Sequence, residues 1–107
     1  NGNSSVSTAL FEDGTVVAYG QGVLYKDGSV IEYHGTEIKK LIVNEGVTGI
    51  GGSLCYNLPY LKSVFLPESV TKIGYRCFKE CTSLQEVTLP SNLQTIESYT
   101  TESNNAI

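Results

Sequence analysis

The sequence predicts a mostly β solenoid, in which short parallel strands and short helical turns repeat once per coil. The first observation is a period, since three segments of equal length, 38–60, 61–83 and 84–106, follow one another without a gap. The second is that apolar residues occupy equivalent places in these segments, a pattern typical of repeat arrays. The clearest columns are Leu41, Val64 and Val87; Val43, Leu66 and Leu89; Val47, Val70 and Leu93; and Ile50, Ile73 and Ile96. One unit alone buries too little apolar surface to offset the entropy of ordering it, so the units are expected to stack.

Each repeat is expected to contain two short extended pieces. The segment LKSVFLP opens the second repeat, and its alternation turns Leu61, Val64 and Leu66 to one side of a strand. Pro67 then ends the strand, because proline has no N–H for the ladder of backbone hydrogen bonds. A second extended piece, VTKIG, precedes YRCFKEC (75–81), for which one helical turn is predicted.

The second repeat, LKSVFLPESVTKIGYRCFKECTS, resembles the BspA-like leucine-rich repeat, whose form is LxxLxLPxxLxxIGxxAFxxCxx. It matches that form almost column for column, with Cys77 in place of the usual alanine. The first repeat departs from the form at Asn44, where proline is expected, and the third repeat departs from it over 97–106. The resemblance covers about 38–107 and implies a leucine-rich repeat solenoid with parallel strands.

Residues 9–37 differ from the repeats and are predicted to form an N-terminal β-hairpin cap. FEDGTVVAY and YKDGSVIEY each contain an Asp-Gly turn followed by β-branched and aromatic residues, which is a strong hairpin signal. Such a cap would cover the apolar end of the first coil, since solenoids need capped termini. Residues 1–8, NGNSSVST, are expected to be a flexible lead-in.

The three cysteines are predicted to pack in the core and not to take part in metal binding or redox chemistry. Their odd number excludes a complete disulfide framework. In the resembling repeat Cys81 stands in an inward-facing cysteine column and Cys77 in the alanine column, while Cys55 lies one residue out of register with Cys77. A zinc site needs three or four ligands at suitable spacing, and the one histidine, His34, lies far along the chain. We therefore expect no metal site.

No catalytic constellation is visible, so the chain is predicted to be non-enzymatic. His34 has only Asp13 and Asp27 as partners for a nucleophile–base system, and both aspartates belong to Asp-Gly turns. Neither a phosphate-binding glycine loop nor a calcium-binding acidic spacing occurs, and no cofactor is expected. The net charge is −4 with scattered basic residues, which argues against nucleic-acid binding. No apolar run is long enough to insert into a membrane.

The candidate site is a surface formed by side chains that lie between the inward-facing ones. Stacking would align them in ladders on the concave face of the array. Phe65 beside Ile42 is a large apolar residue flanked by lysines, which is typical of an interface anchor. The alternative is that Phe65 only favours β-structure, since single exposed apolar residues are common. The predicted ligand-binding residues are Ile42, Phe65 and Thr88; Lys40, Ser63 and Glu86; and Lys62, in a ladder with Lys39 and Gln85.

The resemblance implies a cell-surface or secreted module that adheres to host or matrix proteins through this concave face. Because fold does not dictate function, two alternatives stay open. One is a glycan-binding accessory domain of an extracellular enzyme, in which Tyr19, Tyr25 or Tyr33 stacks on sugar rings. The other is a structural spacer. An array with open ends could also form a weak homodimer by end-to-end association.

Overall fold

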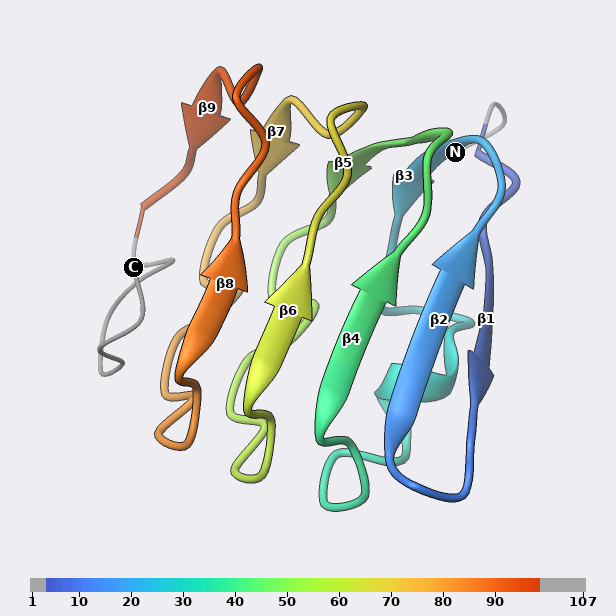
Figure 1. The fold of residues 1–107 in the computed structure, drawn as a ribbon, viewed down its shortest axis with the longest axis vertical. Coiled ribbons are helices and arrows are strands. Elements are labelled where there is room, and N and C mark those ends of the chain that lie inside the picture. Colours follow the sequence, from blue (N-terminus) through green and yellow to red (C-terminus); the bar gives the residue numbers. More distant parts are fainter. Residues whose placement is uncertain (1–3, 99–107) are drawn as a thin grey trace.

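The computed structural model describes residues 4–98, which form a β-solenoid of four successive coils with two sheets (Figure 1). The strands of successive coils pair in parallel, and β1 adds an antiparallel strand to the first sheet. The first sheet contains, in spatial order, β1 (Ser7–Leu10), β2 (Thr15–Tyr19), β4 (Lys40–Val43), β6 (Ser63–Phe65) and β8 (Glu86–Thr88). The second sheet contains β3 (Gly22–Leu24), β5 (Val47–Ile50), β7 (Lys72–Ile73) and β9 (Thr95–Ile96). The predicted mostly β repeat fold is confirmed. The end of the third repeat (99–106) and the start of the lead-in (1–3) lie outside the described residues.

The strands of successive coils pair so that residues one sequence period apart lie side by side. In the first sheet Leu41 lies beside Val64, and Val64 lies beside Val87. In the second sheet Ile50 and Ile73 pair at the same spacing. Each apolar column therefore becomes one row of side chains that runs along the array.

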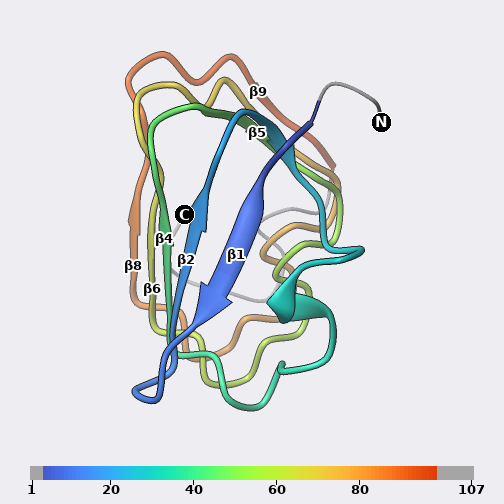
Figure 2. The same ribbon diagram turned by 90° about the vertical axis from the view of Figure 1, so that its right-hand side faces the viewer.

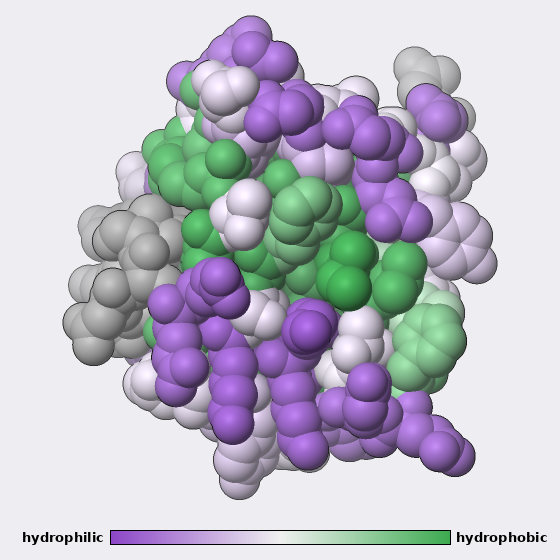
Figure 3. Space-filling model, in the orientation of Figure 1, coloured by the Kyte–Doolittle hydropathy of each residue, from purple (hydrophilic) through white to green (hydrophobic). Residues whose placement is uncertain are grey.

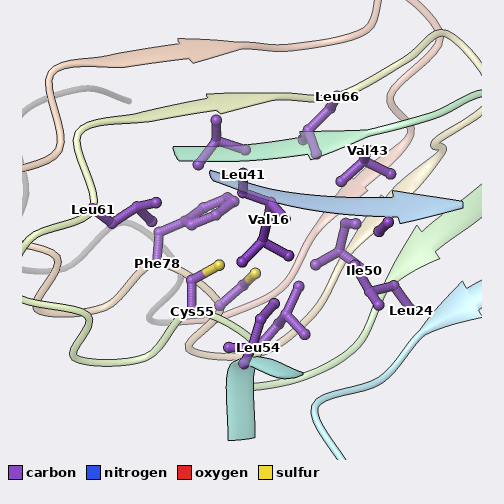
Figure 4. Packing of buried hydrophobic residues seen from close by; sticks show 14 of the residues in the cluster. Val16, Leu24, Leu41, Val43, Ile50, Leu54, Cys55, Leu61, Leu66 and Phe78 are labelled. Atoms are coloured by element: carbon purple, nitrogen blue, oxygen red, sulfur yellow. The ribbon is translucent and has the colours of Figure 1, made fainter. Parts of the chain in front are cut away.

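These rows form the core, which lies between the two sheets and the turns behind them (Figure 4). The residues predicted to face inward in the second repeat, Leu61, Val64 and Leu66, are at most 2% exposed, and Phe78 is fully buried. In the last described coil the inward columns are less covered, as at Leu89, which is 39% exposed. The predicted division between inward and outward positions is confirmed for the second repeat.

The helical turn predicted for 75–81 is wrong, because the segment is a series of tight turns. Arg76 and Glu80 have φ angles of 59° and 60°, in the left-handed region that a right-handed helix cannot include. Ser53 and Asn57, at the equivalent places one coil earlier, have φ angles of 62° and 55°. The same turn geometry therefore recurs in successive coils.

The N-terminal region contains one hairpin and not two. β1 and β2 pair antiparallel around the Asp13-Gly14 turn, as predicted. The prediction of a second hairpin at 25–33 is wrong. Ser29 accepts a hydrogen bond from the Ile31 N–H at 3.2 Å and caps the 3-10 helix η1 (Val30–Glu32), which forms where a strand was expected.

Most of the residues expected to cap the array instead form its first coil. β2 pairs in parallel with β4, and β3 pairs in parallel with β5, with a register shift between Gly22 and Val23. The end of this coil is covered by β1, which lies across the stack in Figure 2. The Val30 N–H donates to the Thr8 hydroxyl of β1 at 2.9 Å, which ties β1 to η1. The cap is thus one strand, and it begins at Ser7, within the expected lead-in.

Glutamate side chains join the coils beyond the ends of β4 and β6. A carboxylate oxygen of Glu45 accepts a hydrogen bond from the Glu68 N–H at 3.1 Å. The Glu68 carboxylate in turn accepts from the Ser91 N–H at 3.1 Å and from the Ser91 hydroxyl at 2.7 Å. These bonds favour the charged form, so the pKa of Glu68 lies below its ordinary value of 4.5, chiefly through the Ser91 hydroxyl.

We expect Phe78→Ala to lower the free energy of unfolding by about 3–5 kcal/mol, because it leaves a cavity in the core. Phe65→Ala removes a side chain that is 48% exposed and should cost less than about 1 kcal/mol. Urea titrations of both variants would measure this difference. A larger loss for Phe65→Ala would contradict the assignment of inward and outward faces.

We also expect the stabilising effect of Glu68 to depend on pH. A lowered pKa in the folded chain means that the contribution is complete above pH 4.5 and is lost as the pH falls through the lowered value. Glu68→Gln should therefore be less stable than the unchanged chain at neutral pH, and this difference should shrink in acid. Urea midpoints measured from pH 7 downwards would test this, and a difference that stays constant into acid would contradict it.

Candidate interaction surface on the first sheet

The outward face of the first sheet carries the row of side chains predicted around Phe65. Ile42 pairs with Phe65, and Phe65 pairs with Thr88, across β4, β6 and β8. Phe65 is 48% exposed, Ile42 is half-buried and Thr88 is exposed. The structure adds Val17 of β2, which pairs with Ile42. We call Val17, Ile42, Phe65 and Thr88 the Phe65 ladder.

The other predicted residues lie beside this ladder. Lys40, Ser63 and Glu86 pair in the same register and form the adjacent row. Lys62 precedes β6, and its N–H donates to the Lys39 carbonyl at 2.8 Å. Two shallow hollows, of about 300 and 400 Å³, lie over the face. The first is lined by Lys40, Ile42, Ser63, Val64, Phe65, Glu86 and Thr88; the second by Asp13, Thr15, Lys39, Lys40, Lys62, Ser63, Gln85 and Glu86.

An apolar band crosses this face between two hydrophilic margins (Figure 3). At the beginning of the strands the margin includes Lys39, Lys40 and Lys62. Beyond the ends of β4 and β6 it includes Glu45 and Glu68, whose carboxylates are exposed. A partner that covers the apolar band would meet positive charge on one side and negative charge on the other.

Asp13 lies at the lysine margin, in the turn between β1 and β2. Its carboxylate accepts a hydrogen bond from the Thr15 N–H at 3.0 Å. The hydrogen bonds from Thr15 lower the pKa of Asp13 below its usual value, and the charge of Lys40 lowers it further. Asp13 is therefore ionised at neutral pH and offsets part of the lysine charge.

The cysteines are core residues, as predicted. Cys55, Cys77 and Cys81 are free thiols that are fully buried. The Cys81 thiol donates to the Cys55 carbonyl at 2.9 Å, and burial raises the pKa of Cys81 to about 11. A hydrogen bond with Cys77 and burial raise the pKa of Cys55 well above its usual value. Since the thiolate is the reactive form, the thiols of Cys55 and Cys81 are poor nucleophiles at neutral pH.

The remaining polar candidates do not assemble into a site. His34 Nδ1 lies 2.8 Å from a Glu37 carboxylate oxygen, and both side chains are exposed. Within residues 4–98 no group of three or more histidine, cysteine or acidic side chains could hold a metal ion. In the same part of the chain no helix has the length and apolar character needed to cross a bilayer.

The three tyrosines considered for sugar stacking lie on different elements. Tyr19 ends β2, Tyr25 follows β3 and Tyr33 follows η1, and they are 49%, 40% and 81% exposed. They therefore do not form one row along the array. Asp13, Thr15 and Val17 lie at the first-sheet face and were missed by sequence reasoning, because their part of the chain was interpreted as a hairpin cap. The signal that could have found them is the recurrence of Val16 opposite Leu41 at a longer spacing than that of the later repeats.

Comparisons with known proteins agree with this architecture. Residues 32–107 match the family model described as "BspA type Leucine rich repeat region (6 copies)". A leucine-rich repeat protein from Eubacterium ventriosum ATCC 27560 has a similar crystal structure, with a TM-score of 0.83 and 22% identity over 97% of this chain. A leucine-rich repeat protein from T. pallidum, TpLRR, is similar with a TM-score of 0.61 and 19% identity over 91% of this chain. The chain spans 29% and 42% of the lengths of these two proteins. No functionally curated protein matches significantly.

The family model covers the greater part of the chain, and the solved structures share its fold. Repeat arrays of this kind generally act as non-enzymatic scaffolds that bind proteins through an extended surface. The chain belongs to the BspA type leucine-rich repeat family.

Proposed function

We propose that this chain is a non-enzymatic module that binds a protein partner through the Phe65 ladder. The observation that carries the proposal is the position of Phe65, a large apolar side chain that is 48% exposed in the middle of a row crossing four strands. Buried aromatic anchors surrounded by weaker contacts provide most of the affinity in protein interfaces. Phe65 has such surroundings in Ile42, Ser63 and the lysine margin.

The rigidity of the sheet favours binding at this face. Phe65 lies on β6, whose neighbours β4 and β8 hold it on both sides. Little backbone freedom remains to be lost when a partner binds, and this raises affinity. The opposite charges at the two margins add orientation, because complementary charges favour one docking pose over others.

We further propose that the module is displayed on a cell surface or secreted, and that it adheres to host or matrix proteins. The family resemblance supports this placement, because BspA-like repeats are typical of surface and secreted adhesive proteins. The solvent-facing rows support the adhesive role, since several coils present one continuous surface to a large partner.

Phe65→Glu should strongly weaken binding to the protein partner, because it places a charge at the centre of the apolar band. Surface plasmon resonance over a panel of purified extracellular-matrix and host-cell-surface proteins would identify a partner and measure the change. We expect the Kd to rise at least about 100-fold, as for loss of an interface anchor.

Tyr33→Glu is the matched control, because Tyr33 is 81% exposed and follows η1, away from the first-sheet face. It removes an aromatic ring and adds the same charge, so it should leave the Kd unchanged. Circular dichroism would show that both variants are folded. Equal binding by the unchanged chain and Phe65→Glu, or loss of binding in Tyr33→Glu alone, would contradict the proposal.

A further inference from the structure

The second sheet has a hollow where one side chain of an outward-facing row is missing. Val23, Gly49, Lys72 and Thr95 follow one another in register across β3, β5, β7 and β9. Since Gly49 has no side chain, the row is interrupted between Val23 and Lys72. The resulting hollow has a volume of about 410 Å³, which is within the range of small-ligand sites.

An aromatic ring forms one wall of this hollow. Tyr25 lines it, and the side chain is 40% exposed. A Cβ atom on Gly51 would lie only 2.9 Å from Cδ1 of the Tyr25 ring, so the ring rests against the backbone of the next coil. Tyr25 also lines a second hollow of about 520 Å³, together with Lys26, Asp27 and Gly52. The tyrosine ring thus borders both hollows and lies against Gly51.

The polar groups around the two hollows are balanced in charge. Thr48 and Thr71 line the first hollow, where Lys72 Nζ lies 3.4 Å from a Glu97 carboxylate oxygen. The second hollow has one cation, Lys26, and one anion, Asp27. Each hollow therefore offers hydrogen-bond donors and acceptors without net charge. This chemistry favours an uncharged ligand with many hydroxyl groups over an anionic one.

We propose that this region of the second sheet binds a neutral oligosaccharide. One sugar ring lies over Gly49 with its apolar face against Tyr25, and an adjoining sugar unit extends into the hollow beside Lys26 and Asp27. The aromatic ring supplies apolar contact area to the C–H face of the sugar. The hydroxyls of the sugar bond to Thr48, Thr71 and the Lys72–Glu97 pair. This site goes beyond the proposed protein-binding role and is independent of the Phe65 ladder.

Gly49→Val tests the site directly, because valine is the residue of the same row one coil earlier. The Cβ would meet its nearest neighbour, a methyl group of Val23, at 3.4 Å, which is ordinary contact. Valine suits an extended strand, and its two γ methyl groups reach beyond the Cβ position. Circular dichroism and a thermal melt would show that the variant is folded. The added side chain occupies the part of the hollow in which the sugar ring is proposed to lie. Tyr25→Ala is a second variant that removes the ring and leaves the hollow open.

The probe is a printed array of neutral, sialylated and sulfated oligosaccharides, followed by calorimetric titration with each neutral oligosaccharide that is captured. We expect capture of neutral oligosaccharides, a Kd at least about 10-fold weaker in Gly49→Val and in Tyr25→Ala, and no change in Phe65→Glu. Retention of affinity in folded Gly49→Val would overturn the proposal. So would the absence of any captured neutral oligosaccharide, or capture of the sialylated or sulfated ones alone. None of these outcomes would bear on protein binding at the Phe65 ladder.

Discussion

The close approach of successive coils is the constraint on which the rest of this structure depends. The Gly51 N–H donates to the Leu24 carbonyl at 2.8 Å, and the Gly74 N–H donates to the Ile50 carbonyl at 2.8 Å. A Cβ atom on Gly74 would lie 2.6 Å from the backbone nitrogen of Gly52, so a side chain has no room there. Where successive coils pair at this distance, equivalent residues lie side by side.

Register divides the positions of each repeat into two kinds. Inward columns such as Leu41 and Val64 must stay apolar and similar in size, because they pack against their own equivalents in the neighbouring coils. Outward columns carry no such requirement. Phe65 can therefore stand where the preceding coil has Ile42, and Gly49 where the preceding coil has Val23. Phe65 provides a protruding aromatic side chain, and Gly49 leaves a hollow. Both candidate surfaces therefore arise from variation in outward columns, while the inward columns keep the core unchanged.

The inward columns and the Phe65 row could be predicted from the sequence, because both follow from the period and the alternation of a strand. The first coil could not, since its register shifts between Gly22 and Val23 and its Asp-Gly turns favour a local hairpin interpretation. The turns at Arg76 and Glu80 were missed because these residue types rarely adopt a positive φ. The hollow at Gly49 was missed for a third reason. The column of Gly49, Lys72 and Thr95 is visible in the repeats, but Val23, which forms the other side of the gap, lies in the unrecognised coil.

The most direct test of the close-coil constraint compares Gly74→Ala with Gly49→Ala by urea denaturation. Both replacements reduce the entropy of the unfolded chain by the same amount, so their difference reports on space in the folded state. The added methyl group at Gly74 would meet backbone atoms at 2.6–2.9 Å, whereas the nearest atom at Gly49 lies at 3.4 Å. We expect Gly74→Ala to lower the free energy of unfolding by about 1–3 kcal/mol and Gly49→Ala to leave it unchanged or raise it. Equal stability of the two variants, or a greater loss for Gly49→Ala, would contradict the stacking described for these coils.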